Sequence, residues 1–122
     1  MRRTSFSTAT LAAGAAALAL LTVHCGVGGS QGADTGATCP PGSTLTYANF
    51  GKPFMDNYCV SCHSGKERPS LDSATAVKRE LRGISSTSAA GPKATNDSMP
   101  TDGDVPQDDR VKLGEWLACG AP

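Results

Sequence analysis

The chain has 122 residues and a formal net charge of zero, with 11 Lys and Arg against 11 Asp and Glu. This length fits a single domain. The charge balance argues against a nucleic-acid-binding surface and leaves the charge of any protein partner undetermined.

The N-terminus has the features of a secretory signal. Arg2 and Arg3 form a short basic start, and residues 11–21 (LAAGAAALALL) are an unbroken apolar run. A run of this length is too short to span a bilayer comfortably, whereas it suits a signal peptide. We therefore expect residues 1–24 to be a signal peptide, with a buried N-terminal helix as the alternative, and the chain to be exported to a bacterial periplasm.

Residues 21–25 (LTVHC) resemble a lipoprotein signal, in which the cysteine becomes the lipid-bearing first residue. Leu21 stands four positions before Cys25 instead of three, and His24 replaces the usual small residue. We expect Cys25 to be lipidated, so that the protein is anchored to a membrane; cleavage nearby with Cys25 as a spare thiol is the alternative. Residues 25–44, rich in Gly, Ser, Thr, Ala and Pro, predict a flexible tether.

The region 45–122 predicts an all-α domain, because no segment has the pattern of a strand. Residues 45–58 carry aromatic side chains at helical intervals, and Pro53 predicts that this helix is kinked or begins late. A second helix, capped by Ser70 or Asp72, should run to about Arg82 and end at Gly83. Residues 85–103 form a long loop. The last helix should begin at Pro106 and end at Gly120.

Residues 59–63 (CVSCH) contain a motif with a specific chemistry. The C-x-x-C-H pattern is the attachment site of c-type haem. Two thiols three positions apart on a helical turn can each add to a vinyl group of one porphyrin, and the following imidazole then falls beneath the iron. We predict one covalent haem c held by Cys59 and Cys62, with His63 as the proximal iron ligand.

The candidates for the distal iron ligand are few. His63 is the only histidine after the predicted signal peptide, so two histidines from this part of the chain cannot ligate one iron. Met55 lies four residues before Cys59, on the side of the attachment helix, and cannot easily reach the far face of the porphyrin. Met99 lies in the long loop before Pro100, which favours extended backbone at the preceding residue. We predict Met99 as the distal ligand; a methionine that packs on the haem without ligating is the alternative.

The remaining cysteines and the composition agree with this prediction. Cys39 precedes the predicted domain and Cys119 lies three residues before its last residue, and the two can form a disulfide in an oxidising compartment, with two free thiols as the alternative. The 98 residues from Cys25 onwards contain only 13 Leu, Ile, Val and Phe, about 13%. Chains below about 20% in these residues are suspected of disorder when their net charge is high. Here the net charge is −2, and an apolar haem can supply the missing core.

Residues 45–122 resemble a class I cytochrome c domain, particularly the short exported cytochrome c-like lipoproteins with CxxCH, a Met-Pro loop and a Trp-Leu-x-Cys-Gly-Ala-Pro ending. The resemblance implies a small all-α fold with long loops around a covalent haem. It also implies that the first and last helices cross near the haem edge, where we expect Gly51, Phe54, Leu113, Gly114 and Trp116. The family usually has a later proline whose carbonyl holds the proximal imidazole. Pro69 follows His63 by only six residues, so we do not assign it this role.

These features predict a non-enzymatic protein that carries one electron between redox partners. A His/Met-ligated iron has no open position for a substrate, and no residues for acid–base catalysis are evident. One alternative is a five-coordinate haem protein that binds a gas or has peroxidase-like activity. Another is a haem-free module, in which Cys59, Cys62 and His63 bind zinc with Cys39 or Cys119, or the two motif cysteines form a thiol redox pair.

Overall fold

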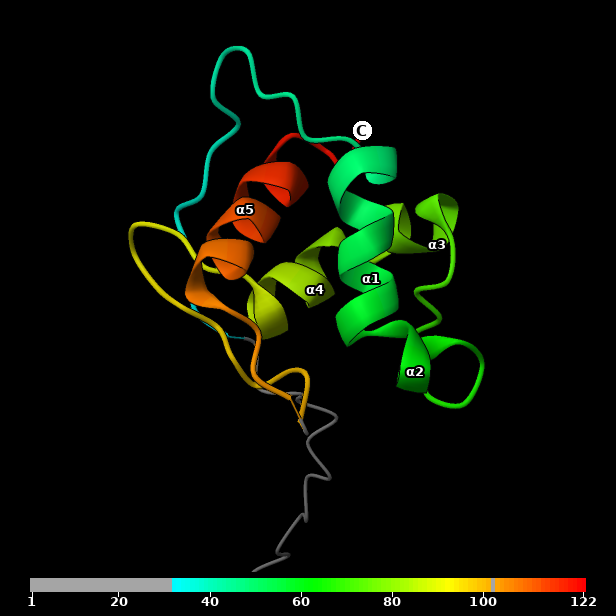
Figure 1. The fold of residues 1–122 in the computed structure, drawn as a ribbon. Helices are drawn as coiled ribbons and strands as arrows, with labels where there is room; N and C mark the ends of the chain where they lie inside the picture. Colours follow the sequence, from blue (N-terminus) through cyan, green and yellow to red (C-terminus); the bar gives the residue numbers. More distant parts are fainter. Residues whose placement is uncertain (1–31, 102) are drawn as a thin grey trace, which may run out of the picture.

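The computed structural model describes residues 32–101 and 103–122. The predicted signal peptide, Cys25 and the first part of the predicted tether lie outside these residues. The described part contains five α-helices and one π-helical turn joined by long loops, with no β-strand (Figure 1). The elements are η1 (Tyr47–Gly51), α1 (Lys52–Tyr58), α2 (Val60–His63), α3 (Ala74–Arg79), α4 (Leu81–Ser88) and α5 (Gln107–Ala118). The prediction of a small helical fold with long loops is confirmed at this level.

The first helical segment begins with a reciprocal cap. The Thr46 hydroxyl accepts from the Asn49 amide at 3.1 Å, and the Asn49 side chain accepts from the Thr46 amide at 2.7 Å. Such a capping box satisfies two amides that have no partner within the helix. Pro53 is the second residue of α1, and it has no N–H to donate to the preceding helical turn. The irregularity predicted from Pro53 takes the form of the π-helical turn η1, which runs directly into α1.

The predicted bounds of the second helix, from Ser70 or Asp72 to about Arg82, are wrong. The structure has two short helices in its place, and Gly83 lies inside α4 instead of ending a helix. Ser73 caps α3, with its hydroxyl accepting from the Ala76 amide at 3.3 Å. The helix α4 continues past Gly83 because Ile84 and Ser88, one turn apart, are both buried. Packing of this face outweighs the helix penalty of about 1 kcal/mol for glycine.

The core lies where η1 and α1 pack against α5. Trp116 is fully buried, with its ring centroid 6.4 Å from that of Tyr47 and 5.9 Å from that of Phe50. A Cβ at Gly51 would overlap the Trp116 indole, so the close approach requires glycine at this position. The chain end closes the same region, because the Tyr47 amide donates to the carbonyl of Pro122 (Figure 1).

The expected helix crossing thus forms, except at one residue. Phe54, Leu113 and Trp116 belong to one buried cluster. Gly114, however, faces away from α1: a Cβ there would meet the carbonyl of Ala90 and the Cβ of Ala37. This glycine allows the long loop, and not α1, to lie close to α5.

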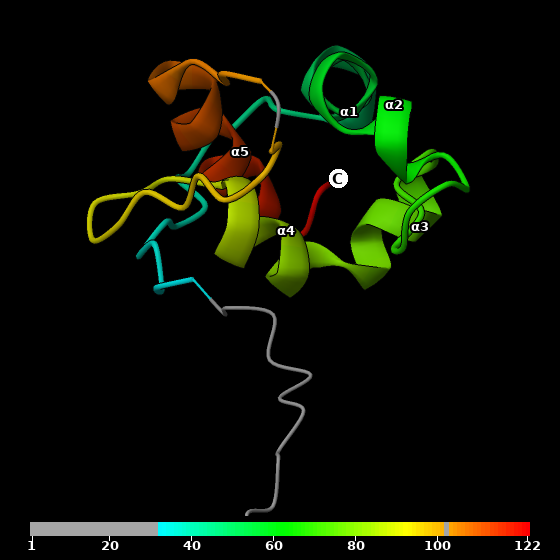
Figure 2. The same ribbon diagram turned by 90° about the horizontal axis from the view of Figure 1, so that it is seen from below.

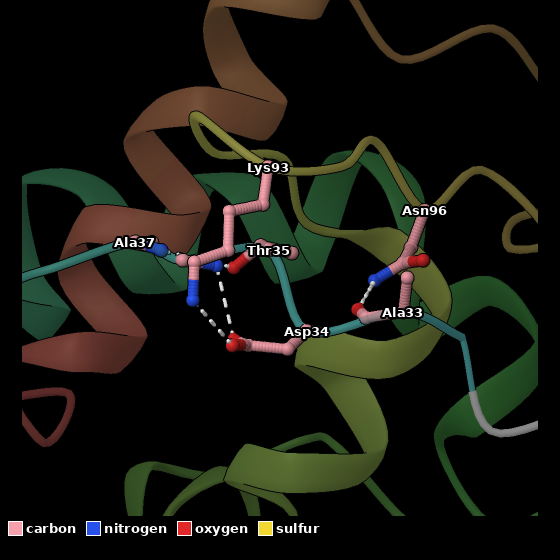
Figure 3. Close-up of polar contacts among 7 residues, drawn as sticks. Ala33, Asp34, Thr35, Ala37, Lys93 and Asn96 are labelled. Atoms are coloured by element: carbon pink, nitrogen blue, oxygen red, sulfur yellow. Dashed lines mark hydrogen bonds and ion pairs between the residues drawn. The ribbon is translucent and has the colours of Figure 1, made fainter.

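Residues 32–44, which the sequence predicted to be part of a flexible tether, form a strap bonded to the domain. The Gly32 amide donates to the Ser86 carbonyl at 3.1 Å, and the Lys93 amide donates to the Thr35 carbonyl at 2.9 Å. Figure 3 shows the Lys93 ammonium, 3.1 Å from an Asp34 carboxylate oxygen, and the Asn96 amide, which donates to the Ala33 carbonyl at 2.8 Å. These partners come from the long loop and α4, which the composition of the strap does not reveal.

A disulfide joins the strap to the end of α5. Cys39 and Cys119 are bonded, with their Cα atoms 4.7 Å apart. The same pair was expected from the sequence. Within residues 32–101 and 103–122, no helix has the length and apolar character needed to cross a membrane.

Candidate cofactor site

The CxxCH motif forms a tight turn at the end of α1. Cys59 links α1 to α2, and its amide donates to the carbonyl of Met55 at 2.9 Å. The amides of Cys62 and His63 both return to the Cys59 carbonyl, at 3.2 and 2.9 Å. Cys59 is half-buried and Cys62 is exposed, and both thiols are free. Met55, one helical turn before Cys59, is fully buried and connects this turn to the core.

The imidazole of His63 is oriented by Pro69. Its Nδ1 lies 2.8 Å from the Pro69 carbonyl oxygen. A carbonyl oxygen only accepts hydrogen bonds, so in the neutral imidazole Nδ1 carries the proton and Nε2 keeps a free lone pair. This is the arrangement that most metal-binding histidines have, since an outer hydrogen bond sets both ring orientation and tautomer.

The expectation that the Pro69 carbonyl does not hold the imidazole is therefore wrong. Six residues suffice because the intervening segment folds back on itself. The Glu67 amide donates to the Cys62 carbonyl at 3.0 Å, and the Leu71 amide donates to the His63 carbonyl at 2.8 Å. Gly65, with φ of +101°, permits the reversal.

The motif residues line a cavity of about 550 Å³, and Met99 lines the same cavity. This volume falls within the range of about 300–1,000 Å³ typical of cofactor and small-molecule sites. Its surface is mostly apolar and includes Leu71 and Ile84, while Glu67 and Arg68 add charge. Figure 2 shows the five helices arranged in a ring, as seen from below. The cavity thus combines two thiols, one imidazole and one thioether from segments that lie far apart in the sequence.

The two methionines have different environments. Met55 is buried in the core and does not line the cavity. Met99 is 38% exposed, whereas its backbone polar groups are both hydrogen-bonded. Its amide donates to the Thr87 carbonyl at 3.0 Å, and its carbonyl accepts from Nη1 of Arg110 at 3.0 Å. Met99 is thus the methionine with a side chain available to a group in the cavity.

The residues present fit a covalent haem. The wall of the cavity is mostly apolar, and it includes the two cysteines that would form the attachment bonds. Nε2 of His63 offers a lone pair, and Met99 offers a soft thioether sulfur. Burial raises the pKa of the Cys59 thiol to about 11. Cys59 is therefore protonated at neutral pH in this environment, unlike the activated thiolate of a disulfide oxidoreductase.

Two other features bear on the alternatives. Cys39 and Cys119 are bonded to each other, so neither can complete a metal site with Cys59, Cys62 and His63. The described residues contain no group of three or more His, Cys, Asp or Glu arranged to hold a metal ion. A second, more open hollow of about 620 Å³ lies beside the Met99 loop, but its lining is mostly polar and includes no residue of the CxxCH motif.

Asn96 and Arg110, which hold the loop of Met99, were not predicted from the sequence. Arg110 was part of the last predicted helix, and its burial was not foreseen. The only available signal was its place on the apolar side of that helix, three residues before Leu113. Comparisons with protein-family models, with curated proteins and with solved structures found no match for this chain.

Proposed function

We propose that this protein is a single-haem c-type cytochrome that carries one electron between redox protein partners. Cys59 and Cys62 would hold the haem through thioether bonds, His63 would be the proximal ligand and Met99 the distal ligand. The bound haem would supply a one-electron couple, and thioether ligation favours its reduced state. The resemblance to class I cytochrome c domains points to the same function.

One observation carries the proposal. Two thiols, a thioether and an imidazole line a single cavity, and the imidazole has its tautomer set for metal ligation by Pro69. The chain's own residues would orient the imidazole, exclude water with the apolar wall and position the thioether. None of these residues forms an acid–base pair, so we propose electron transfer and not an enzymatic reaction.

The proposed location follows from the sequence and the disulfide. The basic and apolar N-terminus predicts export, and a disulfide between Cys39 and Cys119 would persist in an oxidising compartment. We propose a periplasmic protein anchored to a bacterial membrane through lipidated Cys25. The strap then leaves only the residues before 32 as a connection between the lipid and the domain.

The first test is whether haem is bound covalently. The full chain would be produced with the haem-attachment machinery, denatured, and separated from any free haem. Haem retained on the polypeptide, lost in a Cys59→Ala, Cys62→Ala variant, is the expected result. Haem that dissociates on denaturation, or a protein that purifies with zinc instead, would refute the proposal.

The second test is a matched pair of methionine substitutions. Met99→Leu removes the thioether from the cavity, and Met55→Leu removes the other one from the core with little change in volume. We expect Met99→Leu to abolish the thioether-to-iron charge-transfer band of the ferric protein and to lower its midpoint potential. Met55→Leu should retain both properties. A Met99→Leu variant with an unchanged ferric spectrum and potential would support the five-coordinate alternative instead.

A further inference from the structure

Arg110 is a buried cation at the junction of α5 and the Met99 loop. The residue is only 5% exposed, and its Nη1 lies within hydrogen-bonding distance of three carbonyl oxygens. These are the carbonyls of Ser88 at 2.8 Å, Asn96 at 3.1 Å and Met99 at 3.0 Å. The guanidinium therefore connects the last helix to the end of α4 and to two points of the loop.

The charge of Arg110 favours the loop position in which the three carbonyls accept its hydrogen bonds. A buried guanidinium is costly unless hydrogen bonds replace its water, and hydrogen bonds from an ionised donor are stronger than neutral ones. Among the described residues no carboxylate forms an ion pair with Arg110, so the carbonyls carry this role. If the loop moved away, it would leave the buried charge without these acceptors, and the folded protein resists that movement.

Met99 is held at the centre of this network. Its amide bonds to Thr87 and its carbonyl to Arg110, so both backbone polar groups are fixed. Asn96 anchors the preceding part of the loop, because its side-chain amide donates to the carbonyls of Ala33 and Ser85 at 2.8 and 2.9 Å. The side chain of Met99 is the part of the residue left free to reach the cavity.

We infer that Arg110 is a positioning residue for the distal ligand: through the carbonyl of Met99 it holds the thioether sulfur at the haem iron. This inference rests on the proposed function. Arg110 itself touches no reacting atom. Arg110 raises the fraction of protein in which Met99 is bound to the iron. It therefore lowers the apparent affinity of any external ligand that competes for the same position.

Imidazole binding to the ferric haem protein measures this fraction. Free imidazole must displace Met99, so its apparent affinity rises as the loop loosens. Arg110→Met removes the charge and the donors while keeping a long side chain, and Arg110→Lys keeps the charge with a different donor geometry. We expect imidazole to bind Arg110→Met about tenfold more tightly than the parent, the effect of losing one charge-assisted hydrogen bond. The thioether charge-transfer band should weaken in parallel, with Arg110→Lys intermediate.

Two controls separate positioning from general stability. Val77→Ala leaves a void beside α3 and lowers stability, and Val77 does not line the cavity that Met99 lines. Arg79→Met removes an exposed arginine from the same helix. Both should keep the imidazole affinity of the parent within threefold. A change below threefold in Arg110→Met, or an equal change in Val77→Ala, would overturn the inference. If Arg110→Met does not accumulate as holoprotein, Arg110→Lys decides the result by the same threefold limit.

The same measurements distinguish failure of the inference from failure of the proposed function. If the chain binds no covalent haem, or if Met99→Leu leaves imidazole affinity unchanged, the proposed ligation is wrong. If Met99→Leu abolishes the band while Arg110→Met matches the parent, the ligation stands and only the role of Arg110 is refuted.

Discussion

Replacing both Cys39 and Cys119 by Ala is expected to lower the free energy of unfolding by about 4 kcal/mol. The disulfide closes a loop with a sequence separation of 80 residues. In the chain-entropy account, a cross-link that closes a loop of this length lowers the conformational entropy of the unfolded chain. At 25 °C this stabilises the folded state by about 4.5 kcal/mol. Cys39 is exposed and Cys119 is half-buried, so the packing lost with the two sulfur atoms is small.

The folded structure should survive this change. The Ser43 hydroxyl donates to a Glu115 carboxylate oxygen at 2.6 Å, and the Tyr47 amide donates to the Pro122 carbonyl, so noncovalent contacts still hold the two ends together. The loss of stability therefore arises from the greater freedom of the unfolded chain. The m-value should also rise, because a chain without the cross-link exposes more surface on unfolding.

Guanidinium unfolding of the holoprotein, followed by circular dichroism, measures this difference. Thr38→Ala with Ala118→Ser is the matched control, since these exposed neighbours leave the disulfide intact and should change stability by less than about 0.5 kcal/mol. Mass spectrometry of the parent would verify the disulfide. A loss below about 1.5 kcal/mol in the double cysteine variant, with the parent oxidised, would refute the loop-entropy reasoning.

Two further predictions concern the core. Gly51→Ala should destabilise the protein by about 1–3 kcal/mol in thermal unfolding, because the added Cβ overlaps the buried Trp116 indole; a variant as stable as the parent would show that the helix crossing can relax. The chain produced without haem should be largely unfolded, because it then has a thin apolar core and an empty cavity of about 550 Å³. A weak helical circular dichroism signal is expected, and a cooperative, helical haem-free form would contradict this reasoning.

Local patterns and the small number of cysteines were enough to predict the helical class and the disulfide. The CxxCH motif places its three functional groups on adjacent turns, so its chemistry depends little on the remaining fold. The helical class follows from local periodicity, and Cys39 with Cys119 followed from the count of cysteines left after the others had roles. Met99 was singled out in the same way, because the chain offers few possible ligands.

The extent of the helices was less predictable, because burial can override local preference. Gly83 has a low helix propensity, yet Ile84 and Ser88 are buried on one face of α4 and the helix continues through the glycine. The strap shows the same effect. Its composition is that of a flexible segment, but its backbone finds partners on Ser86 and Lys93, far along the chain.

The cofactor site shows most clearly which features can be predicted from the sequence and which depend on the tertiary structure. The residue types in the CxxCH motif and Met99 indicate a haem site from sequence alone, because that chemistry needs those groups at that spacing. The Pro69 carbonyl that orients His63, and the Arg110 guanidinium that holds the Met99 carbonyl, became visible only in the folded protein. Both act through backbone oxygens, which every residue carries and which therefore leave no mark in the sequence. Only the tertiary packing decides which of these oxygens comes within reach.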